Sequence, residues 1–323
     1  FDEFSLGISS SINKDAPEIK QSEEILRGLF ETSETIWVNS WLFDDYCIDW
    51  LESIGKEIVW HKYHYPILEN MNVGIWQNEN AFLDRVAKLG DNGGVFIASE
   101  LSDAITGLET KYIQGDDDWD YHNKTKTPTL EELKDWHNPK LKAGAKRSYF
   151  SPIVSHGADF RNEWKHTALH LKNSSKSIGG TDAVQFAMRN RDAVSIDIFA
   201  TSRELDKKNL DLVKQNALKV ETINEKQLQN IGTWNRDRCC KEIDQNDPIW
   251  KRIKWVDMTG AINREFREPI IMYQLKMLGL KDENITLNTN SSGEGAWKST
   301  EEYYEQIIEG RLLTTEEYIT TND

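Results

Sequence analysis

Residues 78–100, "NENAFLDRVAKLGDNGGVFIASE", contain an amphipathic segment, a glycine pair and then an apolar run. The pattern of residues 78–90 is typical of a helix that ends at a glycine, and residues 93–100 have the composition of a strand. A helix followed closely by a strand is part of a βαβ unit. This stretch therefore suggests a sheet with helices packed on it.

The same alternation occurs on the N-terminal side of this stretch. The sequence predicts strands at 4–10, 35–43 and 57–65, and helices at 17–30 and 45–55. Strands that alternate with helices at this spacing are connected by right-handed crossovers. The sequence therefore predicts a mostly parallel sheet.

Between about residues 107 and 165 the chain is polar, rich in aspartate and interrupted by prolines, which predicts long loops over the sheet. The alternation then resumes with a helix at 179–192, a strand at 193–202, a helix at 203–217 and a strand at 218–223. After about residue 225 the chain is mainly helices and loops. We therefore predict an α/β, Rossmann-like fold with a mostly parallel sheet and flanking helices in residues 1–225, and a mainly helical region in residues 226–323.

Composition excludes several classes of protein. The 54 acidic residues outnumber the 39 basic ones and give a formal net charge of -15, which argues against general binding to nucleic acids or anionic membranes. No apolar run reaches the length of about 18 residues that spans a bilayer. Cys47 and the adjacent pair Cys239 and Cys240 lack the spacing of a zinc site. We expect reduced thiols in a cytoplasmic protein.

Polar residues stand in and directly after the predicted strand 35–43. Ligands of open parallel sheets bind beyond the carboxyl ends of the strands, so Asn39, Ser40, Asp44 and Asp45 are expected to line that crevice. A carboxylate there suits hydrogen-bond donors such as the N–H of a base or the hydroxyls of a ribose. The alternative is that Asp44 or Asp45 caps the following helix.

Four segments, in this order, resemble the family 2-like glycosyltransferases of the GT-A fold. "NSWLFD" (39–44) stands where that family has a D-S-x-S-x-D segment, and "GIWQNENAFLDRVAKLG" (74–90) resembles its asparagine-bearing helix, with Asn78 or Asn80 in the matching place. "GVFIASELSD" (94–103) stands where a strand delivers the family's D-x-D metal motif. "SIGGTDAVQFAMRNRDAVSIDIF" (177–199) resembles its later G-G-E-D segment, and the resemblance covers about residues 4–200.

The resemblance implies a GT-A-like fold and the transfer of a sugar from a nucleotide-sugar donor to an acceptor that the sequence does not identify. The first two matching segments, together with the adjacent Asp45, would bind the donor through Asn39, Ser40, Asp44, Asp45 and Asn78. Asn39 stands where the family has an aspartate.

The resemblance also implies a Mn²⁺ or Mg²⁺ ion that offsets charge on the diphosphate leaving group. Its candidate ligands are Glu100 and Asp103 at the motif, or Asp116 and Asp118 in the acidic stretch that follows, which is otherwise a solvated loop. Asp182 stands at the place of the family's catalytic base. It would take the proton of the acceptor hydroxyl in an inverting transfer, or alternatively cap a helix.

Other readings of the sequence stay open. "SIGGTDA" (177–183) is similar to the phosphate loop of the ATP pyrophosphatases, although Ile178 and Ala183 stand where that family has serines. A non-catalytic accessory or viral protein on an α/β scaffold is a further alternative. His166 and His170 have the i, i+4 spacing of a metal-binding pair on a helix, but no second set of acidic ligands accompanies them.

Overall fold

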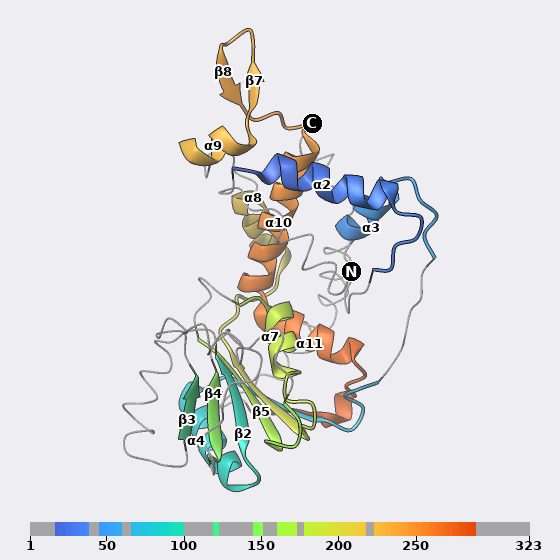
Figure 1. The fold of residues 1–323 in the computed structure, drawn as a ribbon. Helices are drawn as coiled ribbons and strands as arrows, with labels where there is room; N and C mark the ends of the chain where they lie inside the picture. Colours follow the sequence, from blue (N-terminus) through green and yellow to red (C-terminus); the bar gives the residue numbers. More distant parts are fainter. Residues whose placement is uncertain are drawn as a thin grey trace. The chain divides into compact units, whose positions relative to one another are not determined.

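The computed structural model describes residues 17–38, 45–59, 66–99, 119–122, 145–150, 160–172, 178–217 and 223–288 (Figure 1). The chain divides into two compact units. Unit 1 consists of Phe1–Lys62, Asp206–Ile262 and Glu305–Asp323, and unit 2 consists of Tyr63–Leu205 and Asn263–Tyr304. Both units combine segments that are distant in sequence, whereas the boundary expected at residue 225 divides the chain at one place. That boundary stays a prediction.

Unit 2 contains a seven-stranded sheet in which every pairing of neighbouring strands is parallel. The strand order is β3-β4-β2-β5-β6-β1-β9. The strands are β1 (Asn72–Trp76), β2 (Val95–Ser99), β3 (Trp119–His122), β4 (Arg147–Phe150), β5 (His166–Leu171), β6 (Ser195–Ala200) and β9 (Ile285–Asn288). The predicted α/β, Rossmann-like fold with a mostly parallel sheet is confirmed.

Helices cover both faces of this sheet, which explains why β2 is buried along its whole length. Helix α4 (Glu79–Asp91) packs Phe82, Val86 and Leu89 against one face. Helices α7 (Gly180–Ala187) and α11 (Arg267–Met277) lie side by side on the other face (Figure 1). The apolar side chains of each strand therefore divide between two cores, one under α4 and one under α7 and α11.

The predictions of strands at 35–43 and 57–65 are wrong for the residues of these ranges that the structure describes. Residues 35–38 and 57–59 are not strands. Trp37 is 75% exposed and Val59 is 69% exposed. An apolar run forms a buried strand only when a neighbouring strand pairs with it, and no described strand pairs with these residues. The strand that leads into α4 is instead β1, whose five residues include Gly74.

The prediction that residues 107–165 form long loops is wrong in part, because β3 and β4 belong to the sheet. Each has only four residues, and β4 carries a basic residue, Arg147. Short strands with charged residues resemble loops in sequence. They become strands here because β2 supplies a paired neighbour for β4, and β4 supplies one for β3.

Unit 1 is mainly helical. It comprises α2 (Ile19–Thr32), α3 (Asp45–Glu52), α8 (Lys207–Ala217), α9 (Glu225–Ile231), the antiparallel hairpin of β7 (Thr233–Asn235) and β8 (Cys240–Glu242), and most of α10 (Pro248–Glu265). One core cluster joins α2 to α3 through Phe30 and Trp50. Another joins α2, α9 and α10 through Ile19, Ile231 and Trp250.

The predicted helical region after residue 225 is mainly helical where it is described, with the hairpin, the short 3₁₀ turn η4 (Asp282–Asn284) and β9 in addition. Among the described residues, no helix has both the length and the hydrophobicity to cross a membrane.

Candidate functional site

The carboxyl ends of four strands form one row of side chains under the start of α4. Ser99 of β2 pairs in register with His170 of β5, His170 with Phe199 of β6, and Phe199 with Trp76 of β1. Register partners in neighbouring strands share a sheet face, and His170 stacks on Phe82 of α4 with 5.6 Å between ring centroids. This row, hereafter the carboxyl row, lies where ligands of open parallel sheets bind.

Helix α4 begins directly above the carboxyl row because only two residues separate it from β1. Asn78 is its N-cap, and the side-chain oxygen accepts a hydrogen bond from the backbone N–H of Ala81 at 3.1 Å. Glu79 stands in the first turn, where a negative charge is favoured by the helix dipole. The sequence therefore places the first acidic side chain of α4 at the end of the sheet.

Glu79 is one end of a hydrogen-bonded chain that runs into the core. Its Oε1 lies 3.0 Å from His170 Nε2, and its Oε2 lies 2.8 Å from Lys172 Nζ. The hydroxyl of Tyr149 lies 2.8 Å from His170 Nδ1. The carboxylate partner assigns the ring hydrogen to Nε2, so Tyr149 donates its O–H to Nδ1.

The environment sets the charges of this chain. Burial lowers the pKa of His170, although Glu79 opposes the effect, so the imidazole is neutral. For Glu79, burial raises the pKa, but hydrogen bonds from Lys172 and His170 lower it by more. The carboxylate is thus ionised and its side chain is 27% exposed, whereas His170 is 1% exposed. The buried, neutral ring of His170 therefore donates a hydrogen bond to the partly exposed carboxylate of Glu79.

Ser99, next to His170 in the carboxyl row, is fully buried. Its hydroxyl oxygen has no hydrogen-bond partner in the described part of the structure. A buried hydroxyl without a partner is unfavourable. Ser99 is therefore a polar group at the carboxyl row that a ligand or a water molecule would satisfy.

Asp197 lies on the same sheet face as the carboxyl row, two residues before Phe199 on β6. Its Oδ1 accepts a hydrogen bond from Trp76 Nε1 at 2.7 Å, and its Oδ2 lies 3.6 Å from Arg85 Nε. Burial raises the pKa of Asp197, whereas Trp76 and Arg85 lower it to a smaller extent. This carboxylate is enclosed by its partners, and its side chain is only 5% exposed.

The histidine pair noted in the sequence lies on strand β5 and not on a helix, so the idea of a helical metal pair is wrong. Four residues along a strand span about 13 Å. The rings also have different partners, because His166 Nδ1 lies 2.8 Å from Ser195 Oγ while His170 contacts Glu79. One ion cannot be held by both.

Asp182 lies in the first turn of α7, on the opposite sheet face from Glu79. Its Oδ2 accepts a hydrogen bond from the backbone N–H of Gly179 at 3.2 Å, which is the capping alternative raised by the sequence. The N–H and the hydroxyl of Thr181 both donate to Asn263 Oδ1, at 3.2 and 2.9 Å. The polar groups of Asp182 and Thr181 at the start of α7 are therefore already bonded to other groups of the protein, Gly179 and Asn263.

Most of the other predicted site residues lie outside the described residues: Asn39, Ser40, Asp44, Glu100, Asp103, Asp116 and Asp118. Asp45 is the first residue of α3 in unit 1. Asn78 and Asp182 both belong to unit 2. The described residues contain no group of three acidic, histidine or cysteine side chains that would hold a metal ion.

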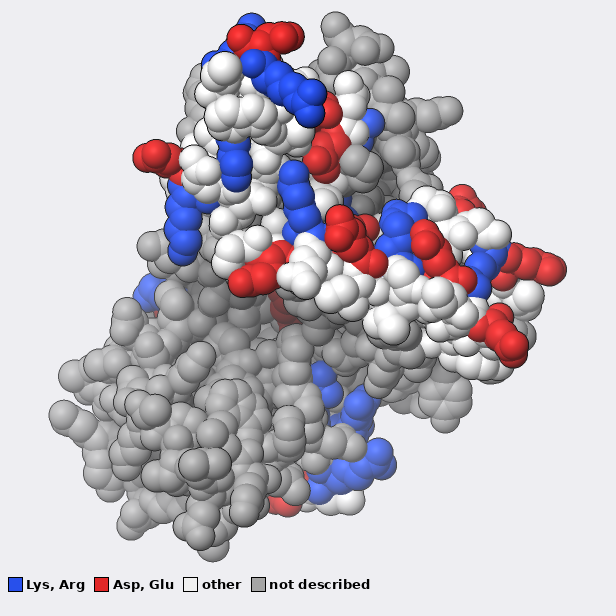
Figure 2. Space-filling model, turned by 45° about the horizontal axis from the view of Figure 1, so that its top comes forward, with Lys and Arg blue, Asp and Glu red and all other residues white. Residues whose placement is uncertain are grey.

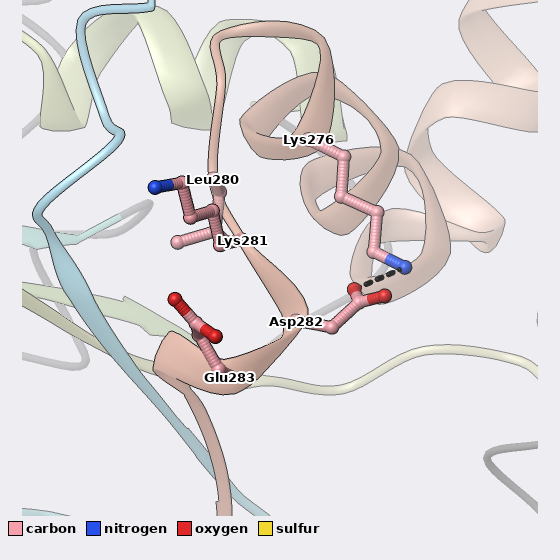
Figure 3. A pocket seen from close by; sticks show the side chains of 5 residues that line it. All are labelled: Lys276, Leu280, Lys281, Asp282 and Glu283. Carbon is pink, nitrogen blue, oxygen red and sulfur yellow. Dashed lines mark ion pairs between the residues drawn. The ribbon is translucent and has the colours of Figure 1, made fainter.

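A surface pocket of about 410 Å³ lies elsewhere in unit 2, at the end of α11 and the start of η4 (Figure 3). Both of its lysines are in ion pairs, Lys276 with Asp282 at 2.8 Å and Lys281 with Glu69 at 2.8 Å. On the upper part of the described surface in Figure 2, basic and acidic side chains are interspersed. Neither feature singles out a site for a charged ligand.

Sequence reasoning missed Glu79, Tyr149 and Lys172. One signal was present, because in "HTALHLK" (166–172) three of the four alternate positions 166, 168, 170 and 172 are polar: His166, His170 and Lys172. That period of two predicts a strand with a polar face. No protein-family model and no curated protein matches this chain.

Proposed function

We propose that unit 2 binds a nucleotide sugar at the carboxyl ends of its strands and that the protein is an inverting glycosyltransferase. One observation carries the proposal: helices α4 and α7 begin after strands of one parallel sheet, on opposite faces, with Asn78, Glu79 and Asp182 in or before their first turns. Ligands of open parallel sheets bind at such strand ends, and helix starts favour anions, although Glu79 and Asp182 already place negative charges in these first turns. The choice of a nucleotide sugar over other phosphate-bearing ligands rests on the sequence resemblance.

The reaction needs a carboxylate that accepts a proton. The acceptor hydroxyl attacks the anomeric carbon while the bond to the diphosphate breaks, and the hydroxyl proton must leave. Asp182 is the base that the resemblance implies, and Glu79 is a second carboxylate in unit 2. The Mn²⁺ or Mg²⁺ ion implied by the resemblance would supply positive charge for the diphosphate, but its candidate ligands lie outside the described residues.

Titration of the whole chain with UDP- and GDP-sugars, with and without Mn²⁺, tests the proposal. We expect one donor to bind with a metal-dependent affinity and to release nucleoside diphosphate on turnover. Binding of ATP in preference to every nucleotide sugar would support a pyrophosphatase-like enzyme instead. The absence of binding to any of these ligands would contradict both enzymatic readings.

A second candidate is a protein that keeps the α/β scaffold without catalysis. The observation that favours it is that Asn78 and Asp182 each accept a backbone hydrogen bond as helix caps. For the pyrophosphatase-like reading, the backbone N–H of Thr181 is already donated to Asn263, so a phosphate would have to displace this side chain.

A further inference from the structure

Asp182 and Glu79, two described carboxylates at helix starts in unit 2, differ in the contacts that the structure shows for them. Asp182 bonds to the backbone of its own helix turn, through Gly179. Glu79 is held by side chains from another element, because His170 and Lys172 belong to β5 or follow it directly. Helix capping explains the place of Asp182. It does not explain why a buried histidine reaches Glu79.

His170 itself is fixed from several sides. Tyr149, which is fully buried, occupies its Nδ1. Phe82 and Phe199 lie against its ring, with 5.6 and 5.8 Å between ring centroids. These contacts hold the ring in the orientation in which its Nε2–H donates to Glu79 Oε1 at the carboxyl row. Burying such a polar chain costs desolvation, which an apolar pair in the same place would avoid.

The outer side of Glu79 is accessible. Lys172, which occupies Oε2, has a side chain that is 56% exposed, so a ligand group is able to take its place. The buried hydroxyl of Ser99 lies beside His170 in the same row and has no partner among the described residues. Glu79 is thus the charged group at the end of the carboxyl row that is both held in place and accessible to a ligand.

We propose that Glu79 is the carboxylate that takes the proton of the acceptor hydroxyl, and that His170 and Tyr149 are its positioning residues. This inference rests on the proposed glycosyl transfer. The acceptor oxygen forms a bond to the anomeric carbon, and the bond between that carbon and the diphosphate breaks. Its electron pair leaves with the diphosphate. The proton passes from the hydroxyl to Glu79 and then to water.

The first test compares Glu79→Gln with Asp182→Asn. Both changes remove one charge from the first turn of a helix and keep the side-chain shape. Glu79→Gln should lower turnover by a factor of about 10² to 10⁴ with donor affinity and Tm nearly unchanged. Turnover in Asp182→Asn decides between the two carboxylates. Near wild-type turnover in Glu79→Gln would overturn the inference, as would a collapse in Asp182→Asn alone. Glu225→Gln, which removes an exposed charge from the first turn of α9 in unit 1, is the control and should keep turnover.

The second test uses Lys172→Met, which leaves Glu79 in place. The base acts when ionised, so turnover falls as the pH decreases through the pKa of Glu79. Lys172 lowers that pKa, and its removal should move the acid limb of the pH profile to higher pH. Lys88→Met, an exposed lysine at the end of α4, is the control and should not move it. A purely structural role for Glu79 would leave the limb unmoved in both variants.

The outcomes separate the inference from the proposed function. If the wild-type chain neither binds nor turns over any nucleotide sugar, the proposed function is overturned and the role of Glu79 falls with it. If the wild type turns over a donor and Glu79→Gln does so equally well, the function stands and only the role of Glu79 is overturned. Circular dichroism of each variant confirms that it is folded.

Discussion

Gly74 of β1 and Asp197 of β6 are register partners, and a Cβ atom added to Gly74 would lie 2.6 Å from Asp197 Oδ1. The same oxygen accepts the hydrogen bond from Trp76 Nε1. The absence of a side chain at Gly74 therefore gives the buried carboxylate the space in which it meets the indole.

Gly74→Ala should destabilise the protein, because Asp197 would have to move away from Trp76. Overpacking of this kind costs about 1–3 kcal/mol, measured as the free energy of unfolding in urea. Gly28→Ala in α2 is the control. Nothing lies within 4 Å of the added Cβ there, so this substitution should stabilise α2 by up to about 1 kcal/mol. Equal stability losses in the two variants would contradict the steric explanation.

Glu268 in the first turn of α11 should make stability depend on pH. Burial raises its pKa to about 7. Its folded-state pKa exceeds the unfolded value, so its contribution to stability is fully present below about pH 4.5 and is lost as the pH rises through 7. Glu268→Gln should therefore raise the free energy of unfolding by about 1–3 kcal/mol relative to wild type at pH 8. At pH 4 the two proteins should be similar.

The control for this experiment is Glu225→Gln, an exposed acidic residue in the first turn of α9. Its effect on Tm should be small. A Glu268→Gln variant with the same Tm difference from wild type at pH 4 and pH 8 would show that this carboxyl does not titrate between them.

Asp182 should show the stability pattern of a cap. Asp182→Ala removes the acceptor for the Gly179 N–H and should cost about 1 kcal/mol. Asp182→Asn keeps an acceptor oxygen and should cost only a few tenths of a kcal/mol. Thermal unfolding of the two variants measures the difference. Equal losses would mean that the charge of Asp182, and not its hydrogen bond, supports α7.

In unit 1, Glu23 of α2 accepts hydrogen bonds from two buried partners, Arg252 of α10 and Trp50 of α3, the latter at 3.0 Å. Glu23→Ala removes the acceptor for both and should cost about 3–5 kcal/mol. Lys20→Ala breaks a more exposed pair with Asp247 at 3.9 Å and should cost less than about 1 kcal/mol. The free energies of unfolding of the two variants test this ranking.

The parts of the fold that could be predicted are those whose patterns are local. Helix α4 and strand β2 follow from an amphipathic segment and an apolar run in one stretch of sequence. The apolar run at 35–43 has the same local pattern, yet Trp37 is 75% exposed. The difference is the partner strand, which a local pattern does not contain. Strand β4 shows the converse case. Its short sequence with the charged Arg147 resembles a loop, yet it is a strand because it pairs with β2.

The candidate site depends even more on distant residues. Glu79 and His170 are 91 positions apart, and no local pattern connects them. The sequence placed Asn78 and Asp182 correctly at helix starts, because caps are local signals. The contact between α4 and the carboxyl row arises only when β1, β5 and β6 are paired.

The position of β1 in the sheet has a consequence for synthesis. β1 ends at Trp76, whereas its two neighbours begin at Ser195 and Ile285. On the ribosome, β1 therefore emerges long before either partner, with both of its backbone edges unpaired. Pairing strands that are so distant in sequence slows folding, and the unpaired edges of β1 can meanwhile aggregate with other chains. Nascent chains that stop before Ser195 should need chaperone protection, and chains that include Ile285–Asn288 should not.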